Sequence, residues 1–224
     1  MHKRQAIAAI VMLSLSATLC PAQDQKAELT RDYNIKPVTF NNVRVEDRFW
    51  TPRLETSRKV TIPYCFEKCE ETGRIRNFEK AAGLIEGKHE GIYFNDSDVY
   101  KVMEGAAYSL QVQPETMMRL YLEKVIKIMA GAQWEDGYLY TFYSVPQRQP
   151  EKLWTDVQRK HEQYCVGHMY EAAVAHYRVT GERSFLDIAT SNADLICDIF
   201  GPGKRTDPPG HQEIEIGLCK LYRL

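Results

Sequence analysis

The fold is decided by the stretch Gly167–Glu182, which reads GHMYEAAVAHYRVTGE. A glycine–histidine pair leads into an apolar helical pattern, and Thr-Gly-Glu is a typical helix stop. The pattern recurs 43 residues later from Gly210-His211, and Tyr-Arg stands near the end of both copies, at Tyr177-Arg178 and Tyr222-Arg223. We interpret the two stretches as copies of a two-helix repeat, the second cut off at Leu224. We therefore expect the chain to be part of a larger protein.

Helical periodicity continues on both sides of this repeat. The spacing of apolar residues predicts helices over 99–110, 114–131, 155–164, 167–179 and 185–199, and a last helix after the Gly- and Pro-rich linker 201–210. Helix pairs joined by short turns form either an open solenoid or a closed toroid, and periodicity does not decide between them. The unusual polar residues lie at helix starts and in long loops, which favours an all-α barrel with its site at one end.

Two local features depart from regular helices. Val38-Thr39-Phe40 and Val43-Arg44-Val45 alternate around Asn41-Asn42, a turn signal, and predict a short β-hairpin near the N-terminus. Pro63 is expected to interrupt the helical pattern that extends from Arg53 to Glu71.

Residues 1–22 are predicted to be a signal peptide. Basic residues precede an apolar run, Ala6–Leu19, that is short for a bilayer span, and Ala22 suits a cleavage site. We therefore expect a periplasmic or secreted protein, with a flexible polar segment at 23–35 and one domain at 36–224. No later stretch has the length and apolarity of a membrane helix, so we expect no membrane contact after signal cleavage.

The composition limits the classes of partner and the state of the cysteines that we expect. A net charge of −1 removes the electrostatic argument for nucleic acid. Thirteen tyrosines supply rings that suit stacking on sugars, although tyrosines are also common at core edges. After the signal peptide the chain has an odd number of cysteines, so at least one is unpaired. We expect mostly free thiols that are buried in the helical core. These cysteines are Cys65, Cys69, Cys165, Cys197 and Cys219.

Histidines are the first candidates for a functional site. His161, Cys165 and His168 would share one face of an unbroken helix and form a zinc site, but Gly167 is expected to end that helix and lose the register. His161 and His211 stand near helix starts, where an imidazole can donate to a ligand hydroxyl. The alternative for each is an ordinary capping or core histidine.

Carboxylates are the second candidates. Asp96 and Asp98 have the spacing of paired acid–base carboxylates, but the same spacing is typical of a helix start, and capping is favoured. Glu213 and Glu215 complement a helix dipole and need no further role. The sequence contains no Gly-rich phosphate loop, no Gly-x-Ser-x-Gly elbow and no His-Glu-x-x-His motif.

Four motifs, taken in order, resemble those of glycoside hydrolase family 127, the β-L-arabinofuranosidase-like enzymes. They are Phe94–Lys101, Ala132–Leu139, His161–His168 and Gly210–Glu215, and the resemblance extends from about Val38 to Leu224. It implies the N-terminal half of an (α/α)6 barrel, the six-hairpin toroid. The domain at 36–224 would then be an incomplete catalytic domain of a retaining exo-glycosidase that acts on β-L-arabinofuranosides of plant glycans.

The resemblance also implies which groups perform the chemistry. The family uses a cysteine nucleophile that is one ligand of a zinc ion, with further cysteines and a glutamate as the other ligands, and a separate glutamate as acid/base. In the family these residues lie in the second half of the barrel, and none of the cysteines of this chain matches their motif. We therefore expect zinc in the full-length enzyme and none bound by this chain. We also expect no catalytic residue here, so that the chain alone is inactive.

The sugar-contacting histidines of the family fall in segments that match His161 and His211, and Asp96 and Asp98 match a loop near the pocket mouth. The resemblance therefore predicts these four residues as substrate-binding, with an arabinofuranose-containing oligosaccharide as the partner. Two alternatives stay open on the sequence. One is a non-catalytic helical-hairpin module that binds sugar or protein, and the other is a different (α/α)6 glycosidase.

Overall fold

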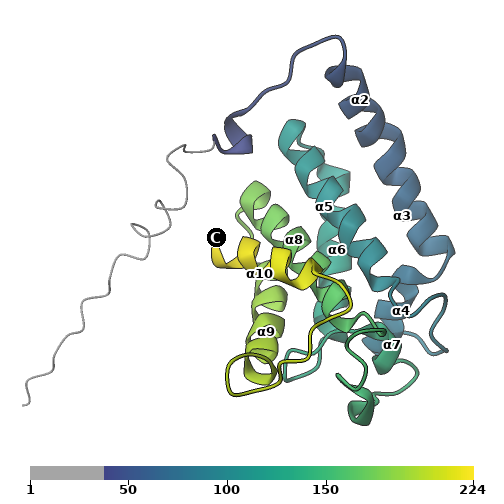
Figure 1. The fold of residues 1–224 in the computed structure, drawn as a ribbon. Helices are drawn as coiled ribbons and strands as arrows, with labels where there is room; N and C mark the ends of the chain where they lie inside the picture. Colours follow the sequence, from purple (N-terminus) through teal and green to yellow (C-terminus); the bar gives the residue numbers. More distant parts are fainter. Residues whose placement is uncertain (1–37) are drawn as a thin grey trace, which may run out of the picture. The chain divides into compact units, whose positions relative to one another are not determined.

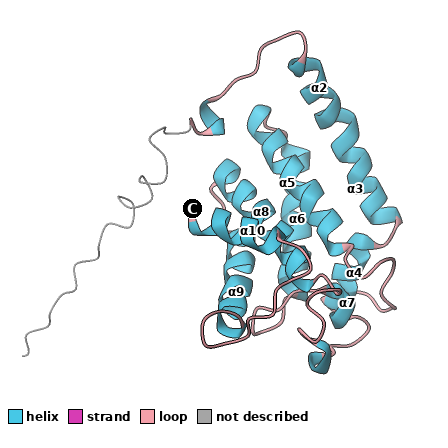
Figure 2. Cartoon of the chain, in the orientation of Figure 1, coloured by secondary structure: helices cyan, strands magenta, loops and turns pink. Residues whose placement is uncertain are grey.

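The computed structural model describes residues 38–224, which are mostly helical (Figure 1, Figure 2). The helices are α2 (Trp50–Thr56), α3 (Ile62–Glu71), α4 (Arg74–Ala81), α5 (Asp96–Val112), α6 (Thr116–Ala132), α7 (Thr141–Ser144), α8 (Glu162–Thr180), α9 (Ser184–Ile199) and α10 (Glu213–Tyr222). Shorter helical segments are η1 (Phe40–Asn42), η2 (Ser57–Thr61) and η3 (Pro150–Lys152). The predicted signal peptide at 1–22 and flexible segment at 23–35 lie outside the described residues. No described helix combines the length and the apolarity needed to cross a bilayer.

The long helices pack around α8 and α6. Helix α8 lies against α5, α9 and α10, and α10 crosses it (Figure 1), whereas α6 lies against α4 and α9. The central helix is α8, whose Ala172, Ala173 and Ala175 have no exposed surface. Small side chains at these positions let neighbouring helices approach closely. The structure therefore agrees with the predicted all-α class, and closure into a six-hairpin barrel stays a prediction.

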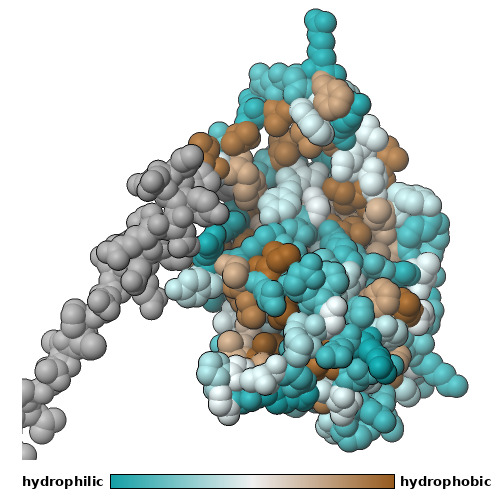
Figure 3. All heavy atoms as spheres, in the orientation of Figure 1, coloured by the Kyte–Doolittle hydropathy of each residue, from teal (hydrophilic) through white to brown (hydrophobic). Residues whose placement is uncertain are grey.

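Apolar side chains also reach the surface. On the face drawn in Figure 3 they gather between the α2–α3 segment and α5. A hollow of about 330 Å³ lies there, lined in part by Leu54, Tyr108 and Val112. Phe49 and Trp50, at the start of α2, are more than half exposed. The helices at this end of the described chain thus leave apolar surface uncovered.

The predicted β-hairpin at Val38–Val45 is not formed. Phe40–Asn42 is a 3-10 helix, and residues 38–224 contain no strand. An isolated two-stranded hairpin has little stability without a sheet or a helix that covers one face. Val38 and Val43 are 69% and 56% exposed, and Phe40 packs edge-on against Tyr108 with ring centroids 5.1 Å apart, so within residues 38–224 this segment has no sheet to pair with.

The helix is not interrupted at Pro63. It continues from α2 through η2 into α3, and Pro63 occupies the start of α3. The segment η2 is π-helical, with a wider turn than an α-helix. A proline ring inside a helix collides with the carbonyl four residues earlier, here that of Lys59, and a π turn relieves this contact.

Gly167-His168 does not begin a helix, which corrects the predicted boundaries. A single helix, α8, starts at Glu162 and runs through this pair, whereas residues 153–160 are turns and not the predicted helix. Gly167 is required by packing instead. A Cβ atom there would lie 2.7 Å from the backbone carbonyl carbon and oxygen of Glu213, so α8 and α10 touch backbone to backbone at this point. A glycine demanded by a tertiary contact looks the same in sequence as a helix boundary.

Candidate functional site

His161 lies at the N-terminus of α8 in an unusual backbone conformation. Its φ is 61°, in the left-handed region that few non-glycine residues adopt. The ring stacks on Phe94, with centroids 5.1 Å apart and planes 26° from parallel, and Nδ1 lies 3.0 Å from the carbonyl oxygen of Arg159. The Arg159 carbonyl and the stacking on Phe94 thus fix the orientation of the imidazole, and no residue in 38–224 hydrogen-bonds Nε2.

Glu162 holds the loops that surround His161. Its side chain is buried, and Oε1 accepts hydrogen bonds from the Tyr138 hydroxyl at 2.7 Å and the Trp154 backbone N–H at 3.1 Å. Trp154 also has a positive φ, 60°. Glu162 therefore ties the loop before α7 and the segment before α8 to the helix start. Sequence reasoning missed this residue, because the predicted helix over 155–164 places Glu162 near a helix end, and its partners Tyr138 and Trp154 lie outside that helix.

Burial raises the pKa of Glu162 from 4.5 to about 7, against the lowering effect of its two hydrogen-bond donors. The folded chain thus binds this proton more tightly than the unfolded chain, so the contribution of Glu162 to the free energy of unfolding falls as pH rises from about 4.5 to 7. The fall is on the order of 3 kcal/mol. We expect Glu162→Gln, which stays neutral, to lose this part of the pH dependence. Urea unfolding of both proteins at pH 4.5 and 7.5 measures it, and equal pH dependence in the two would contradict the assignment.

Tyr164 brings the two candidate histidines together. Its ring meets His161 edge-on at 5.4 Å and His211 at 4.8 Å between centroids. The Lys101 ammonium donates to the Tyr164 hydroxyl at 2.6 Å. His211 lies just before α10, and its Nδ1 accepts the backbone N–H of Glu213 at 3.2 Å. Residues 50 positions apart in the sequence therefore border one half-buried aromatic ring. Tyr164 was not predicted, although it stands one helical turn after His161, on the same face.

Asp96 and Asp98 take different places, and neither caps α5. Asp96 has no exposed surface, and it accepts hydrogen bonds from the Thr141 backbone N–H at 2.8 Å and the Thr141 hydroxyl at 2.5 Å. Burial raises the pKa of Asp96 to about 6, although these hydrogen bonds act to lower it. Asp98 is half-buried and pairs with Arg74 at 2.7 Å. The structure places Asp96 as a support of the α7 loop and Asp98 at the surface beside α4.

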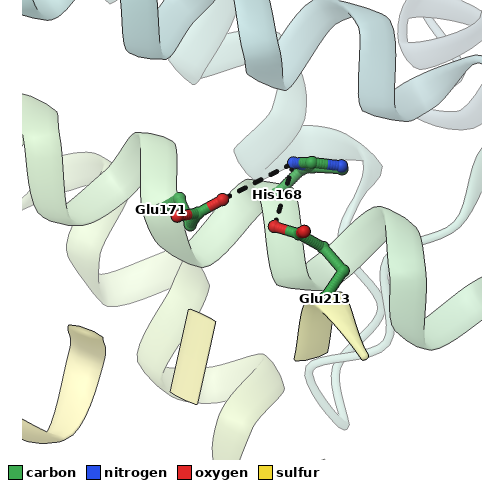
Figure 4. A group of neighbouring side chains, drawn as sticks. All are labelled: His168, Glu171 and Glu213. Carbon is green, nitrogen blue, oxygen red and sulfur yellow. Dashed lines mark ion pairs between the residues drawn. The ribbon is translucent and has the colours of Figure 1, made fainter. Parts of the chain in front are cut away.

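A second polar cluster lies between α8 and α10, below Tyr164. The Nδ1 of His168 is 3.0 Å from Oε1 of Glu213 and 3.7 Å from Oε2 of Glu171, and the three side chains point toward one another (Figure 4). Burial lowers the pKa of His168 to about 4, so its imidazole is neutral at neutral pH. Burial and the neighbouring Glu171 raise the pKa of Glu213 to about 8. The sequence predicts no role for Glu213 beyond the helix dipole, because no local pattern indicates that it faces α8.

The described cysteines lie outside the cluster that could hold a metal ion. All five cysteines of the described residues are free. Cys165 is fully buried, and its thiol lies 3.5 Å from the Phe94 carbonyl, away from a shared site with His161 and His168. Burial raises the pKa of Cys165 and that of Cys69, which is about 11, so both remain protonated thiols at neutral pH. Among the described residues, the group placed to hold a metal ion is His168, Glu171 and Glu213, which contains no cysteine.

Cys197 and Cys219 correct one expectation about the thiols. They are exposed, although their apolar sequence neighbours predicted burial. Both lie on the exposed sides of α9 and α10, whereas the neighbouring Ile196 and Leu218 are more buried.

Comparison with known proteins defines the class to which this fold and these motifs belong. Residues 42–224 match the model of the catalytic domain of β-L-arabinofuranosidases of glycoside hydrolase family 127. The chain belongs to this family.

Individual relatives support the assignment to this family. A non-reducing end β-L-arabinofuranosidase of Bifidobacterium longum subsp. longum is 33% identical over 208 residues, which cover 81% of this chain and 31% of the relative. Two solved structures superimpose with a TM-score of 0.77 each. The GH127 β-arabinofuranosidase BT3674 is 48% identical and covers 85% of this chain and 31% of its own. Ara127N-Se, a GH127 β-L-arabinofuranosidase from Geobacillus stearothermophilus T6, is 40% identical and covers 81% and 30%. The chain thus spans about 31% of the length of these relatives.

Proposed function

We propose that this chain supplies the N-terminal part of the catalytic domain of an exo-acting β-L-arabinofuranosidase, the first half of an (α/α)6 barrel. Within it, His161 and His211 contact the terminal sugar. The observation that carries this role is their convergence on Tyr164 from the starts of two neighbouring helices. Membership of the family supports the reaction class.

The chemistry of these side chains suits a sugar. Each histidine has Nδ1 engaged with the backbone, and within residues 38–224 no group hydrogen-bonds the Nε2 of either ring. Each Nε2 can thus exchange a hydrogen bond with a sugar hydroxyl. Tyr164 and Phe94 add aromatic surface, which packs against the C–H face of a sugar ring. In this proposal Asp96 acts through the α7 loop, and Asp98 lies toward the pocket mouth without a contact of its own.

The groups that perform the bond cleavage are proposed to lie outside this chain. We propose that nucleophile, acid/base and zinc ligands lie in the region of the relatives that this chain does not span. The chain alone would then bind a sugar weakly and hydrolyse nothing. We also propose export through residues 1–22, which fits a substrate that is a plant glycan outside the cell.

A chimeric enzyme tests the proposal. Residues 38–224 replace the matching N-terminal region of the 48% identical β-arabinofuranosidase. We expect the chimera to hydrolyse an aryl β-L-arabinofuranoside with a kcat/KM within about tenfold of the parent, a cost of about 1.4 kcal/mol for imperfect junctions. The isolated chain should release no aryl alcohol. A chimera that melts cooperatively yet shows no turnover, or turnover by the isolated chain, would contradict the proposal.

A further inference from the structure

We propose that His168, Glu171 and Glu213 bind a divalent transition-metal ion of the zinc type between α8 and α10. Each residue offers one ligand atom, and these atoms lie within 4.8 Å of one another. The site contains no cysteine, so it is distinct from a zinc ion held by thiolates, and it does not depend on the proposed glycosidase activity.

The distances fit a single small ion. Zinc binds imidazole nitrogen and carboxylate oxygen at about 2.0–2.2 Å, so two ligand atoms on a tetrahedral ion are about 3.4 Å apart. The His168 Nδ1 atom is 3.0 Å from Oε1 of Glu213 and 3.7 Å from Oε2 of Glu171, on either side of that value. All three ligand atoms lie within 4.8 Å of one another, so rotation of the two glutamate side chains would complete the three-ligand geometry. A fourth position remains for water, as in many histidine–carboxylate zinc sites.

An unpaired buried oxygen points into the same space. Glu213 is 6% exposed, and its Oε1 has no hydrogen-bond partner among the described residues, although it faces His168. Native proteins rarely leave such an atom unsatisfied, and an ion is one of the recurrent reasons when they do.

The Lys220 ammonium is the positively charged group of this region, and it does not occupy the proposed metal site. The Lys220 ammonium pairs with Oε1 of Glu171 and lies 3.5 Å from Glu104. Oε2 of Glu171 remains directed at His168 (Figure 4). Two carboxylates thus contact one ammonium, and Oε1 of Glu213 lies on the His168 side of the cluster.

The scaffold holds the ligands in place. His168 and Glu171 are three residues apart on α8 and therefore lie on one face, and Glu213 begins α10. The two helices are in backbone contact beside the site, since a Cβ atom at Gly217 would lie 2.6 Å from the Gly167 carbonyl oxygen. The imidazole favours zinc, copper, iron or nickel over calcium and magnesium, which prefer oxygen ligands alone.

Zinc titration of the purified chain tests the site. The chain is first stripped with a chelator and then titrated with zinc chloride in a calorimeter, and with cobalt chloride in a spectrometer. The background carries Cys197→Ser and Cys219→Ser, because these exposed thiols would bind zinc on their own. We expect one zinc ion per chain, a higher melting temperature with zinc, and a cobalt spectrum without thiolate charge-transfer bands.

Two substitutions then assign the ligands. Loss of a residue that only contacts a metal ligand weakens metal binding by about tenfold or more. Glu213→Gln and His168→Gln should each weaken zinc binding by well over tenfold. Glu215→Gln, on the exposed side of the same helix, should leave the affinity unchanged. Absence of stoichiometric zinc binding by the unsubstituted cluster overturns the proposal, and so does binding that survives both Glu213→Gln and His168→Gln. The titration of the protein with His168, Glu171 and Glu213 intact is sufficient to test the proposal. A variant that fails to fold therefore does not rescue it.

Discussion

Replacing Gly167 by alanine is expected to lower the free energy of unfolding by about 2 kcal/mol or more. The new Cβ atom would lie 2.7 Å from the Glu213 carbonyl carbon and oxygen and 2.8 Å from the Ile214 nitrogen. These are backbone atoms of α10, so no flexible side chain can move aside, and the whole helix must shift away from α8. The usual gain of about 0.5–1 kcal/mol for alanine over glycine inside a helix offsets only part of this cost.

Gly105 provides the matched control for this substitution. It lies in the middle of α5, and a Cβ atom there meets nothing within 4 Å. Gly105→Ala should therefore raise stability by about 0.5–1 kcal/mol. Urea unfolding of the wild type and both variants measures the difference. If Gly167→Ala is as stable as Gly105→Ala, then α8 and α10 are not in backbone contact, and the convergence of the two histidines loses its support.

Much of the helical fold was predictable because each helix has its own local pattern. The apolar stripe of α5 includes Val99, Met103 and Leu110, all buried in the structure, and Pro114 correctly marks the start of the next helix nearby. Such stripes depend on the 3.6-residue period and need no knowledge of the neighbours.

The errors have a shared physical origin in tertiary contacts. Gly167 was interpreted as a helix boundary because the close approach of α10 cannot be read from local sequence. Pro63 was interpreted as a break, whereas a π turn accommodates it inside a continuous helix. The alternation around Asn41-Asn42 predicted a hairpin that has no sheet to join within residues 38–224.

The candidate site was predictable only in part, for the same reason. The position of His161 and His211 near helix starts suggested that they converge, and the structure brings both to Tyr164. Tyr164 itself and the buried Glu162 were missed, because aromatic and acidic residues at helix starts are common and their partners are distant in sequence. Whether the histidines contact sugar stays a prediction.

We expect His161→Ala and His211→Ala to lower kcat/KM by about ten- to more than a hundredfold each in the chimeric enzyme. A hydrogen bond between an imidazole and a sugar hydroxyl that strengthens in the transition state contributes roughly 1.5–3 kcal/mol, which corresponds to that range. Stability should change little, since both rings are only half-buried and neither fills the core.

His176 is the control for this prediction. It lies well inside α8 and is 2% exposed; neither ring nitrogen has a hydrogen-bond partner among the described residues, and its nearest aromatic neighbour is Phe185 at 6.3 Å. His176→Ala leaves a cavity and should lower the melting temperature, while kcat/KM measured well below that temperature stays near the wild-type value.

The most direct test is therefore kcat/KM on an aryl β-L-arabinofuranoside, measured with the melting temperature for all three histidine variants of the chimera. Our account predicts large losses of kcat/KM for His161→Ala and His211→Ala at nearly unchanged melting temperature, and the opposite pattern for His176→Ala. If His176→Ala impairs catalysis as much as the other two, or if His161→Ala and His211→Ala only unfold the protein, both histidines are structural residues and the proposed sugar site is wrong.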